Sequence, residues 1–562
     1  NTCTADCTKC SELALTHLAA DKSTNTPTAL WVADATERGL LIDWVRGADD
    51  LDENLDGYRS DVRPSLHGDV LHSRPAVINY NRGGEDKDVV VFYGANDGVF
   101  HAALGGLEAG DGRELWGFVP SEFFPQLKTL WNNDTLGHPY FFDGSVAVLT
   151  EDRNEDGRLV AQDGDRVHLF LTLRRGGRLL YALDVSEPER PRFLWKRSYR
   201  DTGFGELGQS WSEPRVARIN LNGSSTEVLI FGLGYDPLAD DLQPAAAATM
   251  GRGVMVVEAA TGDPIWQAGP EPAGAQHNLT VAEMIYSIPS DIKVLNRDGD
   301  PQRLADRAYV GDSGGNLWRL DLHDSNPANW TVSRLASLGG TTDGEKRKFL
   351  FAPEVVYHRD DTGAFDALYI GSGDREHPFS ISVADRFYMV KDRRIDPAAP
   401  QEPVVVEEDL YDATDNLVQM GTADQRQAAK TELASKRGWY VRLREGEKVV
   451  GGVVVVAGST FFSTHQPSLP DANQCNSLGT ARNYVLDFMD ASATTDWDGV
   501  DGLTTLDRTV EIPGGGFPPS PVSVITQVDG RIRGAVVIGT WVADGPAPSD
   551  VRQRVYRFRE ME

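Results

Sequence analysis

Short runs of Val, Ile, Leu, Tyr and Phe recur along the chain, and each run leads through a Gly-rich turn into a second apolar run. About seven copies of this unit occupy residues 89–104, 167–185, 228–266, 307–322, 366–392, 453–488 and 535–559. β-Branched and aromatic residues bounded by Gly, Asn and Asp are typical of β-hairpins. A single hairpin cannot bury both faces, so the copies are expected to stack radially as the blades of a propeller. The pattern predicts an all-β chain.

Helical signal is confined to a few segments. Residues 422–438 are rich in helix formers, with Thr422 or Asp424 as the expected N-cap and Gly438 as the expected end. Two more helices are expected near the N-terminus, in SELALTHLAADKS and ATERGLLIDWVRG.

Four tryptophans lie at or near the ends of the repeated units: Trp116, Trp195, Trp266 and Trp318. Large indole rings at these points are expected to fill the wedge between neighbouring blades. We interpret them as core residues of the architecture and not as a cofactor site.

A chain of 562 residues could form several ordinary domains or one large propeller. We predict an N-terminal extension over residues 1–65, which would be the end of a longer N-terminal region, and a propeller domain over residues 66–562. Asp and Glu number 84 against 55 Lys and Arg, which gives a net charge of −29. This charge repels nucleic acid and anionic lipid. No apolar run approaches the roughly 20 residues of a transmembrane helix.

The four cysteines are Cys3, Cys7, Cys10 and Cys475. The first three have the spacing of an iron–sulfur motif, but the barrel of alternating strands and helices that holds such clusters is not predicted. The chain starts at Asn1 and not at Met, so a signal peptide is expected to have been removed. An even number of cysteines in a secreted chain predicts two disulfides, one of which joins the N-terminal trio to Cys475. The pairing within the trio stays open.

One Asp-rich loop matches the spacing of a calcium-binding loop. Its oxygen donors at positions 1, 3, 5, 7 and 12 are Asp152, Asn154, Asp156, the carbonyl of Arg158, and Asp163. Alternate side chains can point at one centre, and Gly157 at position 6 permits the sharp turn.

A second loop starts in the same way. Its candidate ligands are Asp52, Asn54, Asp56, the carbonyl of Tyr58, and Asp61. Asp, Asn and Gly also favour plain turns, because their side chains hydrogen-bond the local backbone. For both loops a solvated turn therefore remains the alternative to a calcium site.

A third acidic loop, NRDGDPQRLAD, lies before the strand-like segment RAYVG. Its candidate ligands are Asn296, Asp298, Asp300, the carbonyl of Gln302, and Asp306. Asn stands at the first position and Pro301 replaces the usual Gly, so the pattern alone leaves a calcium site and a plain turn equally open.

Several long segments resemble, in order, the C-terminal domain of the PilC/PilY family. They are LHGDVLHSRPAVINY, DVVVFYGANDGVFHA, DRAYVGDSGGNLWRLDL, KRGWYVRLREGEKVVGG and the segment around Cys475. The resemblance implies a modified seven-bladed, quinoprotein-like β-propeller with a few short helices. It also implies a Ca²⁺ site in residues 296–306, whose occupancy biases pilus extension against retraction.

The same resemblance implies a secreted, non-enzymatic protein of type IV pilus biogenesis, located at the pilus tip or outer membrane. The implied partners are pilus subunits (minor pilins) and host or abiotic surface ligands, with a role in adhesion. Some family members carry an Arg-Gly-Asp tripeptide that contacts integrins. The nearest match here is Arg46-Gly47-Ala48, so integrin binding is not expected.

Two other functions stay open. A quinoprotein-type dehydrogenase uses similar blades and calcium, but this chain has no pair of adjacent cysteines. A glycan-binding or glycan-hydrolysing propeller is the other alternative. His67 and His72 lack the spacing of a zinc pair and are expected to hydrogen-bond a loop.

Overall fold

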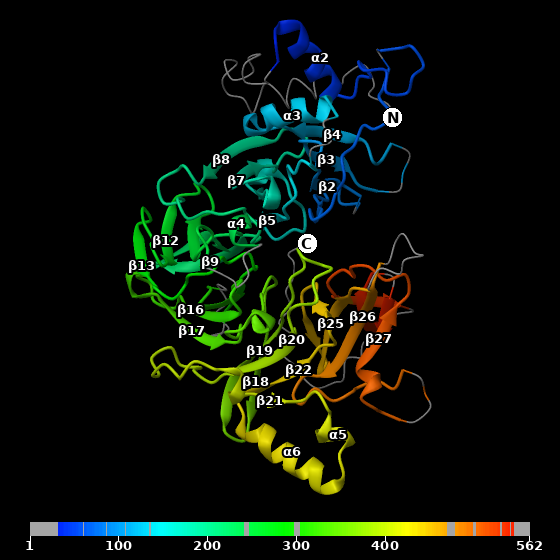
Figure 1. Ribbon diagram of the computed structural model, residues 1–562. Helices are drawn as coiled ribbons and strands as arrows, with labels where there is room; N and C mark the ends of the chain where they lie inside the picture. The colour runs from blue at the N-terminus through cyan, green and yellow to red at the C-terminus, as the bar shows by residue number, and fades with distance from the viewer. Residues whose placement is uncertain are drawn as a thin grey trace. The chain divides into compact units, whose positions relative to one another are not determined.

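The computed structural model describes residues 32–544, apart from residues 60, 86, 107, 109, 134–136, 241–246, 297–303, 469–477, 498, 500–501, 529–530 and 540. Within this part of the chain seven β-sheets follow one another (Figure 1). The predicted fold class, an all-β chain of seven propeller-type blades with few helices, is confirmed.

The first three sheets contain four, four and five strands. They are β1 (Ala76–Asn79), β2 (Val89–Gly94), β3 (Phe100–Leu104) and β4 (Glu114–Phe118); β5 (Val146–Glu151), β6 (Arg166–Thr172), β7 (Leu179–Asp184) and β8 (Arg192–Ser198); and β9 (Arg215–Leu221), β10 (Ser224–Gly232), β11 (Val254–Glu258), β12 (Pro264–Gly269) and β13 (His277–Thr280).

The other four sheets follow the same plan, with extra short strands in two of them. They are β14 (Lys293–Leu295), β15 (Arg307–Gly311), β16 (Asn316–Asp321) and β17 (Thr331–Ser337); β18 (Glu354–Asp360), β19 (Gly363–Gly371), β20 (Arg386–Asp392), β21 (Tyr411–Asp412) and β22 (Gly438–Arg442); β23 (Lys448–Val449), β24 (Val454–Val456), β25 (Ser459–Gln466), β26 (Thr480–Asp487) and β27 (Thr509–Ile512); and β28 (Val522–Val528), β29 (Arg531–Ile538) and β30 (Trp541–Asp544).

The repeated sequence unit corresponds to the central strands of each sheet. In the fourth sheet, for example, β15 pairs antiparallel with β16, with Arg307 opposite Asp321. The turn between these strands uses Gly315 at φ +76°, a left-handed conformation that suits glycine. The end of the last repeated unit lies outside the described residues, as do all four cysteines, so the disulfides stay a prediction.

The chain divides into two compact units. Unit 1 comprises residues 1–216, 257–263 and 557–562, and unit 2 comprises residues 217–256 and 264–556. In unit 1, two tryptophans do more than fill the core: the indole N–H of Trp116 donates to Pro188 O at 2.7 Å, and that of Trp195 donates to Ala259 O at 2.9 Å. These bonds link the outer strand of one sheet to a turn of the next.

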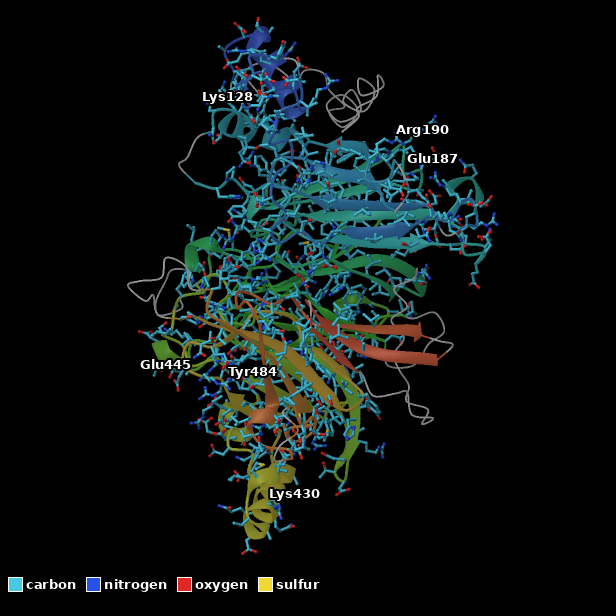
Figure 2. The ribbon with its side chains drawn as sticks, turned by 90° about the vertical axis from the view of Figure 1, so that its right-hand side faces the viewer. Lys128, Glu187, Arg190, Lys430, Glu445 and Tyr484 are labelled. Atoms are coloured by element: carbon cyan, nitrogen blue, oxygen red, sulfur yellow. The ribbon has the colours of Figure 1, made fainter. Side chains whose placement is uncertain are left out.

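In unit 2, Trp266 and Trp318 are buried in one apolar cluster, as predicted for core residues. A second cluster holds the helical insertion against the fifth sheet, through Val418 and Ala429 packed with Trp439. Figure 2 shows the next residue, Lys430, on the outer face of that insertion.

Helices are short and few in the described residues. The α-helices are α2 (Ala35–Val45), α3 (Phe124–Trp131), α4 (Pro237–Asp240), α5 (Leu417–Met420) and α6 (Ala423–Ser435). The 3₁₀ turns are η2 (Ser121–Phe123), η3 (Ala161–Asp163), η4 (Arg174–Gly176), η5 (Pro327–Asn329), η6 (Asp343–Glu345), η7 (Glu407–Asp409) and η8 (Leu506–Arg508). In Figure 1, α2 and α3 lie side by side in unit 1, where Lys128 and Glu37 form an ion pair between them.

The expected N-cap of α6 is confirmed and its expected end is wrong. Thr422 accepts from the N–H of Gln425, whose side chain bonds back to Thr422 in a capping box. The helix ends at Ser435, and Gly438 opens β22 by pairing with Val390. Of the two N-terminal helices expected, α2 is present, and SELALTHLAADKS lies outside the described residues.

Candidate calcium-binding loops

We name the acidic loops Asp loop A (residues 52–61), Asp loop B (residues 152–163) and Asp loop C (residues 296–306). Asp loop B leads out of β5, and backbone N–H groups turn its carboxylates toward the loop. Asp152 accepts the N–H of Gly157 at 2.8 Å, Asn154 accepts that of Asp156 at 3.1 Å, and Asp156 accepts that of Arg158 at 2.9 Å. The structure therefore brings together the predicted ligands at positions 1, 3 and 5.

Asp loop A repeats the same hydrogen bonds. Asp52 accepts the N–H of Gly57 at 3.0 Å, Asn54 accepts that of Asp56 at 3.0 Å, and Asp56 accepts that of Tyr58 at 2.8 Å. Position 1 thus bonds position 6, position 3 bonds position 5, and position 5 bonds position 7 in both loops.

The backbone of the two loops also agrees at positions 4 and 6. Position 4 is left-handed in each, with φ +59° at Leu55 and +56° at Glu155, although such values are uncommon for residues other than Gly. Position 6 is glycine with φ +85° at Gly57 and +79° at Gly157. Two segments in different parts of unit 1 therefore share their conformation at positions 4 and 6, but not at position 1, where Asp52 has φ +55° and Asp152 is not left-handed.

The residue that closes Asp loop B differs from the one expected. Asp163 is exposed within η3, while the buried Asp165 accepts the N–H of Arg153 and of Val160, each at 2.9 Å. Asp165 follows Asp163 and Gly164 in the sequence and could have been considered as the closing residue. The spacing of a calcium loop selects only Asp163.

Aspartates before and after the first turn of Asp loop A accept hydrogen bonds from it. Asn54 donates through its amide to Asp61 at 3.1 Å, which places the predicted last ligand beside the first three. The fully buried Asp49, which the sequence pattern did not single out, accepts the N–H of Glu53 at 2.7 Å.

Each of these two loops contains a buried carboxylate oxygen that accepts no hydrogen bond from the described residues. The atoms are Oδ1 of Asp61 and Oδ1 of Asp152. A buried polar atom without a partner is costly, and a bound cation is one way to satisfy it. Oxygen donors of this kind suit Ca²⁺.

Asp loop C is described only at its two ends. Asn296 follows β14 directly and Asp306 precedes β15 directly, while Asp298, Asp300 and Gln302 lie outside the described residues. The N–H of Asp306 donates to Leu295 O at 3.0 Å, so the two ends of the loop meet at the mouth of the β14–β15 hairpin.

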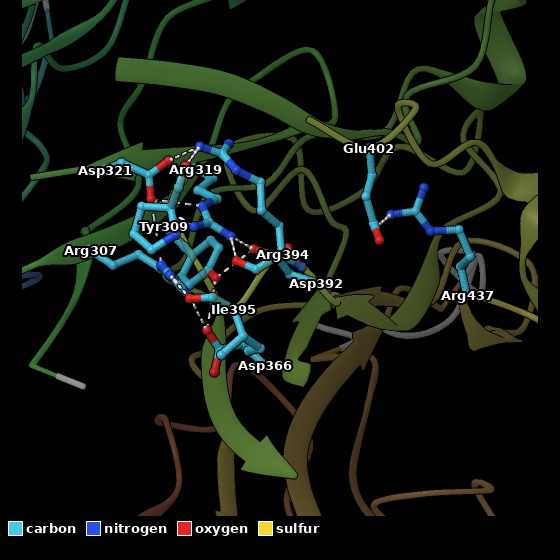
Figure 3. Close-up of polar contacts among 11 residues, drawn as sticks. Arg307, Tyr309, Arg319, Asp321, Asp366, Asp392, Arg394, Ile395, Glu402 and Arg437 are labelled. Carbon is cyan, nitrogen blue, oxygen red and sulfur yellow. Dashed lines mark hydrogen bonds and ion pairs between the residues drawn. The ribbon is translucent and has the colours of Figure 1, made fainter. Parts of the chain in front are cut away.

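A buried cluster of opposite charges begins at the residue after Asp loop C (Figure 3). We call it the Arg–Asp network; its members are Arg307, Tyr309, Arg319, Asp321, Asp366, Asp392 and Arg394. Arg307 pairs with Asp366 at 2.7 Å, and Arg319 lies between Asp321 and Asp392, each at 2.7 Å. The network thus joins the fourth and fifth sheets within unit 2.

The carboxylates of this network favour the charged form of Arg319 and the neutral form of Tyr309. Burial opposes the charge of Arg319, but the carboxylates of Asp392 and Asp321 outweigh it and raise the pKa of the guanidinium. Burial, together with the same negative charges, raises the pKa of Tyr309 well above its usual value, so its hydroxyl donates to Asp392 at 2.7 Å.

The two histidines noted in the sequence have different surroundings. His72 bonds Asp143 at 2.9 Å, which confirms its expected hydrogen-bonding role. His67 lies against Tyr93, with Nε2 and the hydroxyl 3.0 Å apart.

No family model matches the sequence. Type IV pilus biogenesis factor PilY1 of Pseudomonas aeruginosa is 30% identical over 480 residues, which cover 78% of this chain and 35% of that protein. A PilY1 homolog of Xylella fastidiosa is 27% identical over 430 residues, which cover 72% of this chain and 26% of that protein. The crystal structure of the P. aeruginosa PilY1 C-terminal domain superposes with a TM-score of 0.55 and 19% identity, over 82% of this chain and 93% of that one. These matches support a PilY1 family C-terminal domain.

The fold agrees with this likeness, since the superposition covers nearly all of the PilY1 C-terminal domain. The chain spans 23–35% of the length of the curated relatives it matches. None of the helices in the described part of the chain is long and apolar enough to cross a bilayer.

Proposed function

We propose that this chain acts in type IV pilus biogenesis as a non-enzymatic, calcium-binding domain at the cell surface. The main support for calcium is the common set of hydrogen bonds in Asp loops A and B, each with one buried carboxylate oxygen that accepts no described hydrogen bond. Support for the pilus comes from the PilY1 relatives, which are named as type IV pilus biogenesis factors.

The chemistry of the loops favours a hard divalent cation. Each loop gathers carboxylate and amide oxygens, and no lysine or arginine forms an ion pair with Asp52, Asp56, Asp152 or Asp156 among the described residues. Ca²⁺ takes six to eight such oxygens. An extracellular module needs a dissociation constant of only about 10⁻⁴ to 10⁻³ M, because calcium is abundant outside the cell.

Calcium titration of the whole chain by calorimetry tests the proposal. Asp52→Ala and Asp152→Ala should each remove one binding event, and Asp298→Ala or Asp300→Ala should remove another if Asp loop C also binds. Asp343→Ala is the matched control, since it deletes an exposed carboxylate from a turn that lacks the loop pattern. Unchanged binding in all the loop variants would refute calcium binding at these loops.

The pilus role has a separate test. We propose that pilus subunits (minor pilins) and a host or abiotic surface are the partners, and that the protein acts outside the cell at the pilus tip or outer membrane. In a bacterium whose own homologue is deleted, a longer protein carrying this domain should restore surface pili and attachment. Restored pili without attachment would keep the biogenesis role and remove the adhesive one.

A further inference from the structure

Three metal-ligand side chains meet in the first sheet, away from the Asp loops. His67 precedes β1, Asp97 lies on the β2–β3 turn, and His101 lies on β3, with one ligand atom of each within 4.8 Å of the others. We propose that His67, Asp97 and His101 bind one divalent transition-metal ion, of which zinc is the type case. Two imidazoles and a carboxylate are donors that such ions prefer and calcium does not.

Two of the three ligands are buried and already fixed. Asp97 and His101 are 9% and 8% exposed. The carboxylate of Asp97 accepts the N–H of Gly68 and of Val99, each at 2.9 Å, so its position depends on the backbone and not on an ion. A site whose ligands are held beforehand needs little reorganisation to bind.

The spacing of these two ligands fits one ion. Zinc lies about 2.0–2.2 Å from His nitrogen and carboxylate oxygen, and tetrahedral angles then place the two donor atoms about 3.3 Å apart. The Nε2 atom of His101 lies 3.1 Å from Oδ2 and 3.4 Å from Oδ1 of Asp97. A metal can therefore replace the hydrogen bond between them without moving either residue far, with release of the Nε2 proton to solvent.

Glu114 orients the imidazole of His101. Its carboxylate lies 2.6 Å from Nδ1, which leaves Nε2 directed at Asp97. A carboxylate behind a ligating histidine is the usual outer partner in zinc sites, because it fixes the ring and makes the metal-binding nitrogen more basic. Glu114 is thus a positioning residue for the proposed ligand.

His67 is the adjustable third ligand. Its Nδ1 faces Gly68 O at 2.5 Å, and a carbonyl only accepts, so Nδ1 carries the hydrogen and Nε2 keeps the lone pair in the neutral ring. The rings of His67 and His101 stack with centroids 4.8 Å apart and planes 23° from parallel. Nε2 accepts from the Tyr93 hydroxyl at 3.0 Å. Metal binding therefore requires the exposed His67 ring to turn out of this stack and to exchange that hydroxyl for the ion, and the fourth coordination position is left to water.

Another group of ligand-type residues is less suited to a metal. Asp240, Asp374 and His377 also gather within reach of one ion. Lys348, however, already lies 2.9 Å from Asp240 and 2.7 Å from Asp374. Burial opposes the ammonium charge, but the two carboxylates outweigh it and raise the pKa of Lys348, so this position already has its cation.

The test uses the whole chain in excess calcium, so that the oxygen-rich Asp loops do not compete for the added metal. Zinc is titrated by calorimetry, and Co²⁺ is titrated by its visible absorption, which reports nitrogen ligation in a four-coordinate site. We expect one zinc ion per chain, a loss of at least about 10-fold in affinity in His67→Ala and His101→Ala, and a loss of about 10-fold in Glu114→Gln.

The control is His138→Ala, which removes an exposed histidine of the same unit that pairs with Asp69. It should bind zinc and Co²⁺ like the unaltered chain. Because His67 is exposed, His67→Ala should fold even if His101→Ala does not, as judged by circular dichroism. Equal zinc affinity in His67→Ala and the unaltered chain, or an equal loss in His138→Ala, would overturn the proposed site.

Discussion

Among the described residues, negative charge is neutralised by arginines in the Arg–Asp network but not in Asp loops A and B. In the network, three aspartates are buried with three arginines, and the contact distances are as short as 2.7 Å. In the two loops the carboxylates accept only backbone and amide N–H groups along the turn. The network therefore carries its own counter-charge, whereas the loops leave theirs to be supplied from outside.

The difference follows from burial. Arg319 and Asp321 have side chains that are 1% and 2% exposed, and an ion so deeply buried persists only with a partner in place. The loop carboxylates lie mostly at the surface, where water screens their mutual repulsion. A cluster of acidic residues thus indicates a cation site only where the fold provides no arginine or lysine.

The largest effect should come from breaking the network. Arg319→Met leaves Asp392 and Asp321 buried with less compensation, and we expect the free energy of unfolding to fall by roughly 3–5 kcal/mol. Urea denaturation monitored by tryptophan fluorescence measures this change.

Arg437→Met is the control for this experiment. Figure 3 shows Arg437 paired with Glu402, where the two atoms lie 2.5 Å apart. Their side chains are 22% and 34% exposed. Water reaches this half-buried pair and screens it, so the variant should lose much less stability than Arg319→Met. Equal losses in the two variants would mean that burial does not distinguish these pairs.

Asp385 is a buried carboxylate without an arginine partner among the described residues, and it extends the comparison between the network and the loops. Asp385 is 3% exposed and accepts the Ser372 hydroxyl at 2.7 Å; burial raises its pKa to about 7. A pKa that is higher in the folded state stabilises the fold below about pH 4, and this stabilisation is lost as the pH rises through 7. In the unaltered chain this loss lowers the free energy of unfolding by a few kcal/mol between about pH 4 and 8, and Asp385→Asn should remove it. Urea denaturation at several pH values measures the difference.

The opposite slope is expected from Asp360. Hydrogen bonds from Arg393 lower the pKa of Asp360, so its contribution is present above about pH 4 and is lost on acidification. Asp360→Asn should therefore weaken the fold at neutral pH more than at low pH. If Asp360→Asn and Asp385→Asn changed the pH dependence of the free energy of unfolding in the same direction, this interpretation would be contradicted.

Calcium should stabilise the fold through the Asp loops and not through the network. At a calcium concentration ten times the dissociation constant, one occupied site adds about 1.4 kcal/mol to the free energy of unfolding. A thermal melt with calcium and with chelator should show this difference, and Asp52→Ala/Asp152→Ala should lose it. Arg319→Met should keep the calcium response at a lower melting temperature.

The smallest effect concerns the backbone of Asp loop B. Gly157 has φ +79°, and a methyl group at its α-carbon would meet no atom within 4 Å, so Gly157→Ala adds strain without a clash. We expect a loss of about 1 kcal/mol and weaker calcium binding. Gly205→Ala, which also meets nothing within 4 Å but has no left-handed φ, should change neither melting temperature nor calcium affinity.

The features that the sequence predicted correctly depend on near neighbours. Recurring apolar runs bounded by Gly, Asn and Asp located the central strands of each sheet, and the Asp-x-Asn-x-Asp-Gly spacing identified the contacts of Asp52 and Asp152. Thr422 was one of two candidate N-caps, and the capping box that it forms with Gln425 is a local contact across three residues.

The features that were missed depend on pairs distant in sequence. Arg307 and Asp366 are 59 residues apart and meet only because β15 and β19 lie in neighbouring sheets. His67 was compared with His72, five positions away, whereas the fold brings it to His101 on another strand. Gly438 was expected to end a helix, but strand pairing with Val390 decided its place.

The two hydrogen bonds that Asp165 accepts affect how fast Asp loop B could bind an ion. They fix the course of Asp loop B between Arg153 and Val160 by contacts within the chain. An arriving ion would then meet a turn that is already shaped, so the speed of capture would be governed by the shedding of its hydration water, and release would leave the turn ready for the next ion.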